Sequence, residues 1–181
     1  MRNGARHAIV LVGNPKVPSR TSAVSLAVAQ AIMRFARAEG NVDVIELSGL
    51  SDQLFRQADA HVAAAKTAVL GGDLLVVASP VYKASITGLL KAFLDQFGRD
   101  ELGGLATVPL MVGAKADHSL AVEHQLRPVL VEIGASCPSR GLFVLEQQLD
   151  TIGEQLEGWL ATWGPAIVAV MDARSMPGNP S

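Results

Sequence analysis

Short apolar runs alternate along the chain with stretches in which apolar residues recur every three or four positions. The runs at residues 8–12, 74–78, 108–112 and 141–145 predict strands, and the alternation of apolar and polar residues over 42–47 predicts an edge strand. The periodic stretches predict amphipathic helices that pack on the strands. Their apolar residues are Val24, Val28, Ile32 and Phe35, then an alanine-rich stretch over 58–70, then Ile86, Leu90, Phe93 and Phe97, then Val122, Leu126, Leu130 and Ile133, with a last helix over 152–170.

Three prolines refine these predictions. Pro109 has no N–H for a strand ladder, so we expect it at the very start of its strand. Gly164 and Pro165 predict an interruption of the last helix. Pro128 lies four residues after His124 and offers no N–H to its carbonyl, so the fourth helix must bend there or widen locally by one residue. Local π-type widenings tend to occur at functional sites, whereas a kinked packing helix is the alternative.

Five strands alternating with five helices predict an α/β fold, a parallel sheet wound on both sides by helices. At 181 residues the chain has the size of one domain, which we expect over residues 1–174, followed by a disordered tail at 175–181. In such sheets, ligands bind where loops leave the carboxyl ends of the strands. That rule selects the loops at 13–22, 79–85 and 113–118.

Composition excludes several classes of function. The net charge of −2 argues against nucleic acid as a partner. The single cysteine, Cys137, excludes an internal disulfide and a cysteine metal cluster. His118 and His124 lie six positions apart, on different faces of a helix, so we expect no metal site. No apolar run approaches the roughly 20 residues of a membrane helix, so we expect no membrane association and a cytoplasmic location.

The first loop carries three hydroxyl side chains, those of Ser19, Thr21 and Ser22, and the guanidinium of Arg20. It opens the first helix, whose N-terminal N–H groups and partial positive charge suit a phosphate. Neither a Gly-x-Gly-x-x-Gly motif nor a Gly-Lys-Ser/Thr motif stands here, which argues against a dinucleotide fingerprint and a P-loop. We therefore expect a terminal monophosphate, and among common cofactors this favours FMN.

The loops after the third and fourth strands suit a flavin ring. Pro80 fixes its own φ and biases Ser79 toward extended geometry, so the chain leaves the sheet in a defined direction. A stiff loop whose backbone N–H groups face the crevice can bond the ring edge of a flavin. Tyr82 offers an aromatic face or a hydroxyl, and Gly113 tolerates close approach by a ligand. A plain turn is the alternative for each loop. A phosphatase or hydrolase is disfavoured, because neither Cys-x5-Arg after the first strand nor Gly-x-Ser-x-Gly is present.

Several segments of the sequence resemble the NAD(P)H-dependent FMN reductases, and in particular the flavin reductases that serve two-component sulfonate monooxygenases. The similarity runs from about residue 8 to about residue 145, and the motifs keep their order. The segments are Gly13-Asn14-Pro15 with Ser19-Arg20-Thr21-Ser22, then Ser79-Pro80-Val81-Tyr82-Lys83-Ala84, then Thr87-Gly88-Leu89-Leu90-Lys91, and residues 118–128. Three positions depart from the family pattern: Asn14 stands where Ser is common, Ala114 where a second Gly is usual, and Lys115 where a small hydroxyl residue is usual.

This resemblance implies a flavodoxin-like sheet with strand order 2-1-3-4-5. It also implies a subunit interface near the fourth helix, where the sulfonate branch carries an extra Tyr or His that creates a π-helix. His124 matches that position, so we assign it to oligomer formation and flavin exchange and expect a homodimer or homotetramer. The predicted cofactor-binding residues are Asn14, Ser19, Arg20, Thr21 and Ser22 at the phosphate, and Pro80, Val81, Tyr82, Lys83, Gly113, Ala114 and Lys115 at the isoalloxazine ring.

The activity that we predict is hydride transfer from NADPH or NADH to FMN, with reduced FMN supplied to an FMNH2-dependent monooxygenase. Hydride transfer needs stacked and oriented rings more than a protein acid or base, so no residue is assigned a catalytic role. Tyr82 is the only tyrosine and aromatic residues make up 4% of the chain, which favours an open flavin face over the aromatic clamp of a flavodoxin-type electron carrier. A quinone or azo-dye reductase with retained FMN shares every loop and remains an alternative, as does an α/β domain without flavin.

Overall fold

The computed structural model describes residues 5–174, and within that range five strands form one parallel sheet in the order β2-β1-β3-β4-β5. This is the flavodoxin-like order of a doubly wound sheet, so the predicted fold class is confirmed. The predicted tail at 175–181 lies outside the described residues. The strands are β1 (Arg6–Val12), β2 (Gly40–Glu46), β3 (Leu74–Pro80), β4 (Ala106–Gly113) and β5 (Leu142–Leu145).

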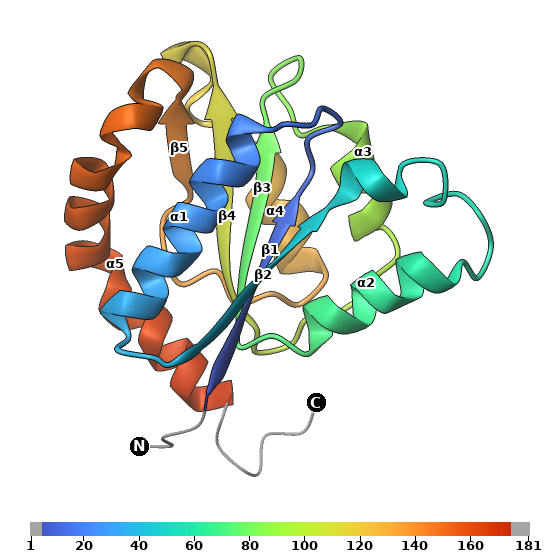
Figure 1. Cartoon of the computed structure of the whole chain (residues 1–181), viewed down its shortest axis with the longest axis horizontal. Helices are drawn as coiled ribbons and strands as arrows, with labels where there is room; N and C mark the ends of the chain where they lie inside the picture. Colours follow the sequence, from blue (N-terminus) through green and yellow to red (C-terminus); the bar gives the residue numbers. More distant parts are fainter. Residues whose placement is uncertain (1–4, 175–181) are drawn as a thin grey trace.

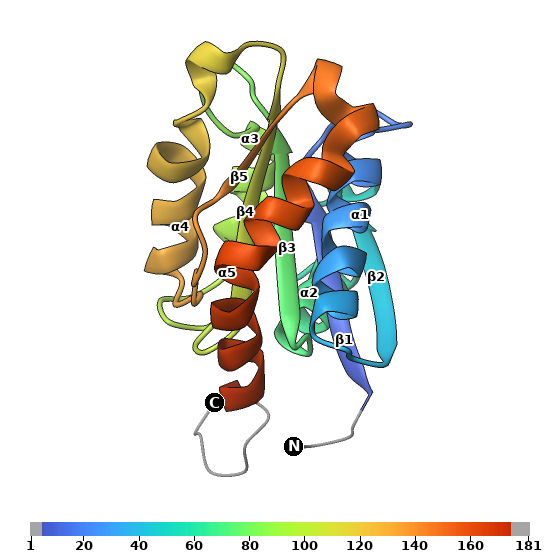
Figure 2. The same cartoon turned by 90° about the vertical axis from the view of Figure 1, so that its left-hand side faces the viewer.

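Helices cover both faces of the sheet (Figure 1). Figure 2 shows α1 and α4 on opposite sides of it. Because successive side chains of a strand point to opposite faces, Val10 and Val12 pack into the core beneath α1 and α5, while Ile9 and Leu11 pack into the core beneath α2, α3 and α4. The helices are α1 (Arg20–Phe35), α2 (Ala60–Leu70), α3 (Gly88–Leu94), α4 (Arg127–Glu132) and α5 (Ile152–Arg174).

Pro109 corrects one prediction, because it lies inside β4 rather than at its start. The N–H of Thr107 donates to the carbonyl of Ser136 on the β5 side of the strand. Backbone groups two residues apart point the same way, so the nitrogen of Pro109 also faces that side. Pairing of β4 with β5 begins only at Leu110, which lies opposite Leu142, and the missing N–H therefore breaks no ladder bond.

Two helix predictions also need correction. The last helix is not interrupted, because α5 runs continuously through Gly164 and Pro165 and only changes direction along its length (Figure 2). The residue whose carbonyl loses its partner, Ala161, is exposed, so water can take the place of the proline N–H. The third helix is shorter than its apolar stripe, since Thr87 caps its first turn and Asp95 ends it.

The carboxyl ends of the strands lie at one edge of the sheet, the top in Figure 1. The loops after β1, β3 and β4 all emerge there, as the sequence predicted. Four short elements complete the chain: η1 (Leu47–Leu50), η2 (Ala116–His118), the π-helix η3 (Val122–Leu126) and η4 (Glu146–Thr151). None of the described helices is both long enough and apolar enough to span a membrane.

Candidate functional site

The loop after β1 is held together by the side-chain amide of Asn14. Its nitrogen donates to the hydroxyl of Ser19 at 3.0 Å and to the hydroxyl of Thr21 at 3.3 Å, while its oxygen accepts from the N–H of Lys16 at 3.0 Å. The Ser19 oxygen also accepts from the N–H of Ser22 at 3.2 Å and so caps the N-terminus of α1. Four of the residues predicted to hold a phosphate are thus brought together in one hydrogen-bonded group.

This arrangement decides what the Ser19 hydroxyl can still do. A hydroxyl carries two acceptor lone pairs and one donor proton. Asn14 and Ser22 use both lone pairs of Ser19, so the remaining capacity is the proton. Ser19 is half-buried at the start of α1 and therefore offers a hydrogen-bond donor, which is what an anion requires.

Arg20, the first residue of α1, forms an ion pair that the sequence did not predict. Its Nη2 atom lies 2.9 Å from Oε2 of Glu146, which begins η4 directly after β5. The Arg20 side chain is 67% exposed and that of Glu146 is 38% exposed, so the pair is open to solvent at the carboxyl edge of the sheet.

The loop after β3 is a tight hairpin with unusual backbone conformations. Tyr82 and Ser85 exchange N–H···O bonds of 2.9 and 3.0 Å, and the two residues between them, Lys83 and Ala84, have φ values of +51° and +60°. A turn with two positive φ values normally contains Asn or Gly, and for other residues it stores about 1–2 kcal/mol each. Such strain gathers at ligand-binding sites. Pro80 lies at the buried end of β3, whereas the Tyr82 side chain is exposed beside the loop.

Gly113 is explained by packing within the protein. A Cβ atom at this position would lie 2.7 Å from the ring of Phe143 and 3.2 Å from a methyl carbon of Val81. Val81 also joins this region through its N–H, which donates to the carbonyl of Val112 at 2.8 Å. The end of β4 therefore contacts the start of the hairpin loop, and the exposed residues Ala114 and Lys115 continue from it along the same edge.

The fourth helix begins with the π-helix η3, so the predicted local widening is confirmed. The N–H of Arg127 bonds to the carbonyl of Val122, five residues back instead of four. Pro128 follows at the first turn of α4, where a missing N–H costs least. His124 lies on the exposed side of the π-helix. Gln125, the next residue, accepts a 3.2 Å hydrogen bond from the hydroxyl of Ser85 and so links the π-helix to the hairpin.

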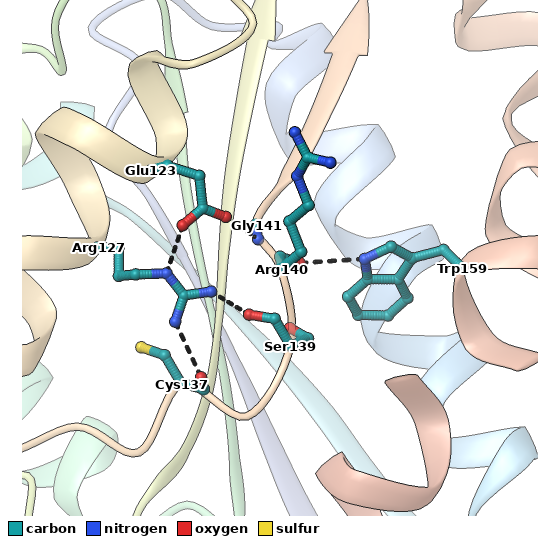
Figure 3. A network of polar contacts seen from close by, with 7 residues as sticks. All are labelled: Glu123, Arg127, Cys137, Ser139, Arg140, Gly141 and Trp159. Atoms are coloured by element: carbon teal, nitrogen blue, oxygen red, sulfur yellow. Dashed lines mark hydrogen bonds and ion pairs between the residues drawn. The ribbon is translucent and has the colours of Figure 1, made fainter. Parts of the chain in front are cut away.

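A network around Arg127 ties the π-helix to the chain before β5 (Figure 3). Its guanidinium donates to the carboxylate of Glu123 at 2.6 Å, to the carbonyl of Cys137 at 2.9 Å and to the carbonyl of Ser139. The other oxygen of Glu123 accepts from the N–H of Gly141 at 2.6 Å. Partial burial raises the pKa of Glu123, but the bonds from Arg127 and Gly141 outweigh it, and the pKa lies below its ordinary value.

Cys137 lies beside this network. Burial raises the pKa of its thiol to about 11, and the nearby Arg127 offsets only part of that rise. The thiol is therefore protonated at neutral pH and unsuited to act as a nucleophile. Among residues 5–174, no group of three His, Cys, Asp or Glu side chains is placed to hold a metal ion.

Residues 7–150 match the NADPH-dependent FMN reductases, which is most of the chain and includes every loop described above. The chain belongs to this family. It is therefore an NAD(P)H:FMN oxidoreductase, with FMN and NAD(P)H as its substrates.

Individual relatives agree with this membership in the FMN reductase family. The chain is 32% identical over 154 residues to the NADH-dependent FMN reductase SfnF of Pseudomonas putida, and the alignment covers 83% of each protein. It is 33% identical over 149 residues to the FMN reductase (NADPH) of Escherichia coli K12, covering 78% of this chain and 74% of that protein. Among solved structures, the apo form of the NADH:FMN oxidoreductase EMOB superposes with a TM-score of 0.80 at 29% identity, covering 96% of this chain and 92% of the other.

For this FMN reductase, sequence reasoning missed the residues that join the loops to one another: Thr87, Gln125 and Glu146. Thr87 precedes the apolar stripe of α3, and a Thr at that place is a recognisable capping signal. Gln125 and Glu146 each contact a residue far away in the sequence, 40 and 126 positions from them, and no local sequence pattern predicts such contacts.

Proposed function

We propose that the carboxyl edge of the sheet binds FMN, with its phosphate at the N-terminus of α1 and its ring between the loops after β3 and β4, and that FMN exchanges as a substrate. Reduced FMN then leaves for a partner monooxygenase of the sulfonate or organosulfur type. The phosphate ligands in this proposal are Asn14, Ser19, Arg20, Thr21 and Ser22, and the ring contacts are Pro80, Val81, Tyr82, Lys83, Gly113, Ala114 and Lys115.

The observation that carries this proposal is the donor-only hydroxyl of Ser19. Asn14 and Ser22 donate to its oxygen at 3.0 and 3.2 Å and so occupy its two lone pairs. The hydroxyl proton is left to act as a hydrogen-bond donor at the N-terminus of a helix. The helix adds partial positive charge and its own N–H groups, and Arg20 adds a full charge in the same turn. A dianionic phosphate ester fits this set, whereas a neutral or cationic ligand does not.

The ring part of the proposal rests on the stiffness of the hairpin. The turn at Lys83 and Ala84, the contact of Val81 with Gly113 and the bond of Ser85 to Gln125 fix the loop on three sides. A bound flavin supplies the hydride-accepting ring, and the residues around it need only hold it against the nicotinamide. This role requires no acid or base of the chain, and Tyr82 is exposed at the hairpin, where it is accessible to a ring.

The π-helix supports the partner and the assembly in this proposal. The resemblance to the sulfonate branch implies an insertion residue in the fourth helix, and His124, in the π-helix η3, occupies the matching position. We assign His124 to the contact between subunits in a homodimer or homotetramer, with an effect on flavin exchange. The relative SfnF is named an NADH-dependent enzyme, and the Escherichia coli relative is named an NADPH enzyme. We expect this chain to oxidise at least one of the two nicotinamide nucleotides.

A series of variants at Ser19 tests the phosphate site. Ser19→Asp keeps the cap of α1, because Asp is as good an N-cap as Ser, but it replaces the donor proton by a negative charge. We expect it to weaken FMN binding at least tenfold, since hydrogen bonds to charged groups contribute about 1.5–3 kcal/mol, and to leave binding of riboflavin, which lacks the phosphate, unchanged. Ser19→Thr, which keeps both cap and donor, should bind FMN as the parent protein does.

Asp59→Ala is the matched control, because it removes the side chain that caps α2, a helix that carries none of the proposed ligand residues. It should lower the stability of the protein without altering the ratio of FMN to riboflavin affinity. Equal losses of FMN and riboflavin affinity in Ser19→Asp, or no loss of either, would contradict the placement of the phosphate at the N-terminus of α1.

A further inference from the structure

The ion pair between Arg20 and Glu146 joins the proposed phosphate site to the segment after β5. Both residues begin a helical element at the carboxyl edge of the sheet, although they lie 126 positions apart in the chain. The Nη2–Oε2 distance is 2.9 Å. The carboxylate therefore sits on the one guanidinium that the proposed site offers to the phosphate of FMN.

From this geometry we propose that Glu146 determines how tightly FMN is held, because its carboxylate competes with the phosphate for Arg20. The inference rests on the proposed function, in which FMN binds with its phosphate at α1. Under it, Glu146 lowers the affinity for FMN and speeds its release, so that FMN leaves as a substrate does instead of staying as a prosthetic group.

Two electrostatic effects act in the same direction. The phosphate carries nearly two negative charges at neutral pH, so a carboxylate on the same guanidinium repels it. The carboxylate also occupies one donor group of Arg20, its Nη2, that the phosphate needs for a bidentate contact. Opposing them is any gain from Glu146 holding Arg20 in place, which is small because the Arg20 side chain is 67% exposed and exposed pairs are weak.

The exposure of the pair also makes it suited to exchange. A buried ion pair would hold Arg20 away from FMN, whereas an exposed pair opens at little cost when the phosphate arrives and closes again when it leaves. Its strength lies in the range that alters an affinity by a few fold without abolishing binding.

Glu146→Gln tests the inference, since the amide oxygen still accepts a hydrogen bond from Arg20 while the negative charge is gone. FMN titration of the apo protein should show an affinity about two- to fivefold tighter than that of the parent, as expected from the strength of exposed ion pairs, with slower FMN dissociation in stopped flow. Riboflavin affinity should stay unchanged. The difference between variant and parent should shrink as salt is added.

Glu157→Gln is the control for net charge, because Glu157 is an exposed carboxylate on α5 and its loss alters the total charge equally. It should leave both affinities as they are. Unchanged or weaker FMN binding by Glu146→Gln would overturn the inference, as would an equal gain for riboflavin.

Arg20→Ala separates this inference from the proposed function. If the phosphate binds at α1, Arg20→Ala weakens FMN binding, and Glu146→Gln then has no further effect in the double variant. If Arg20→Ala leaves FMN affinity unchanged, the phosphate site itself is wrong. If Arg20→Ala weakens binding but the effect of Glu146→Gln persists in the double variant, Glu146 does not act through Arg20 and the inference fails alone.

Discussion

The hydroxyl of Thr87 donates a 2.6 Å hydrogen bond to the carbonyl of Gly13, which joins the first turn of α3 to the loop after β1. The same hydroxyl accepts from the N–H of Leu90 at 3.1 Å, and the N–H of Thr87 donates to the Ser79 hydroxyl at 3.2 Å. Gly13 and Leu90 touch closely, since a Cβ on Gly13 would lie 2.5 Å from the Leu90 Cβ. One buried side chain therefore sets the spacing between the proposed phosphate and ring loops.

Thr87→Val should disturb that spacing while keeping the shape of the side chain. The Gly13 carbonyl and the Leu90 N–H lose a partner in a buried place, which costs about 1–3 kcal/mol of the free energy of unfolding. We expect the KM for FMN to rise more than the KM for riboflavin, because only FMN spans both loops. Denaturation curves and steady-state kinetics measure the two effects.

Two further variants show whether this effect is one of positioning. Thr87→Ser keeps the hydroxyl and should restore the KM for FMN. Thr107→Val removes another buried hydroxyl, one that bonds to the Leu105 carbonyl at 3.0 Å, and should cost stability without altering the ratio of the two KM values. If both KM values rise equally in Thr87→Val, Thr87 has a purely structural role and does not position the two loops for FMN.

Deletion of His124 should convert the π-helix η3 into ordinary α-helix. The Arg127 N–H would again reach a carbonyl four residues back, and Gln125 would turn away from Ser85, removing one support of the hairpin. We expect FMN to leave about tenfold more slowly, equivalent to about 1.4 kcal/mol, and to copurify with the protein. The absorbance of the purified variant and stopped-flow release measure this.

His124→Ala is the control, since it removes the imidazole but keeps the chain length that creates the π-helix. It should retain rapid release if the widening itself matters. A deletion variant that purifies without flavin and turns over FMN at the parent rate would contradict the assignment of His124 to flavin exchange.

Acid should destabilise the protein partly through Glu123. Its pKa in the folded state lies below the ordinary value of 4.5, so the stabilisation is present above that value and is lost as the pH falls through the folded pKa. In Glu123→Gln, stability should therefore depend less on pH below about 5 than in the parent protein. Urea denaturation between pH 3 and pH 7 gives the two slopes, and identical slopes would show that Glu123 is not responsible.

Cys137 should be almost inert toward thiol reagents in the folded protein. With a pKa of about 11, its thiolate fraction at pH 8 is roughly two hundredfold below that of an ordinary cysteine with a pKa near 8.5. A chromogenic disulfide should therefore react at least that much more slowly in buffer than in urea. Rapid labelling of the native protein would mean that the thiol is accessible and ionised.

Much of the fold could be predicted from local pattern. β1 and β3 are continuous apolar runs because both faces of each strand are covered, and α2 begins after Asp59 and ends at Gly71 as their capping chemistry suggests. Pro128 removes a backbone donor from a helix, which predicted either a bend or a local widening, and the structure has the widening. The position of Pro109 within its strand was predicted wrongly. Whether β4 can hold a proline there depends on where β5 begins to pair with it, and this is set by the tertiary structure.

The residues of the candidate site could be proposed from the sequence only where they form part of a local motif. Ser19 and Thr21 stand out as hydroxyls at a helix start, yet the role of Asn14 in saturating Ser19 is a matter of side-chain geometry. Gly113 was singled out for close approach by a ligand, and that role stays a prediction; the side chain that fills the space beside it is Phe143, which only packing reveals. Glu146 carries no motif and is recognisable only because Arg20 meets it in the folded chain.

The most direct test of FMN as an exchanging substrate is the absorbance spectrum of the purified protein, followed by NADPH and NADH oxidation with and without added FMN. We predict a colourless protein that oxidises a nicotinamide only when FMN is supplied and that reduces FMN in equal amount. A yellow protein that reduces quinones or dyes without added FMN would contradict it, because the flavin would then be retained and the acceptor would be a different molecule.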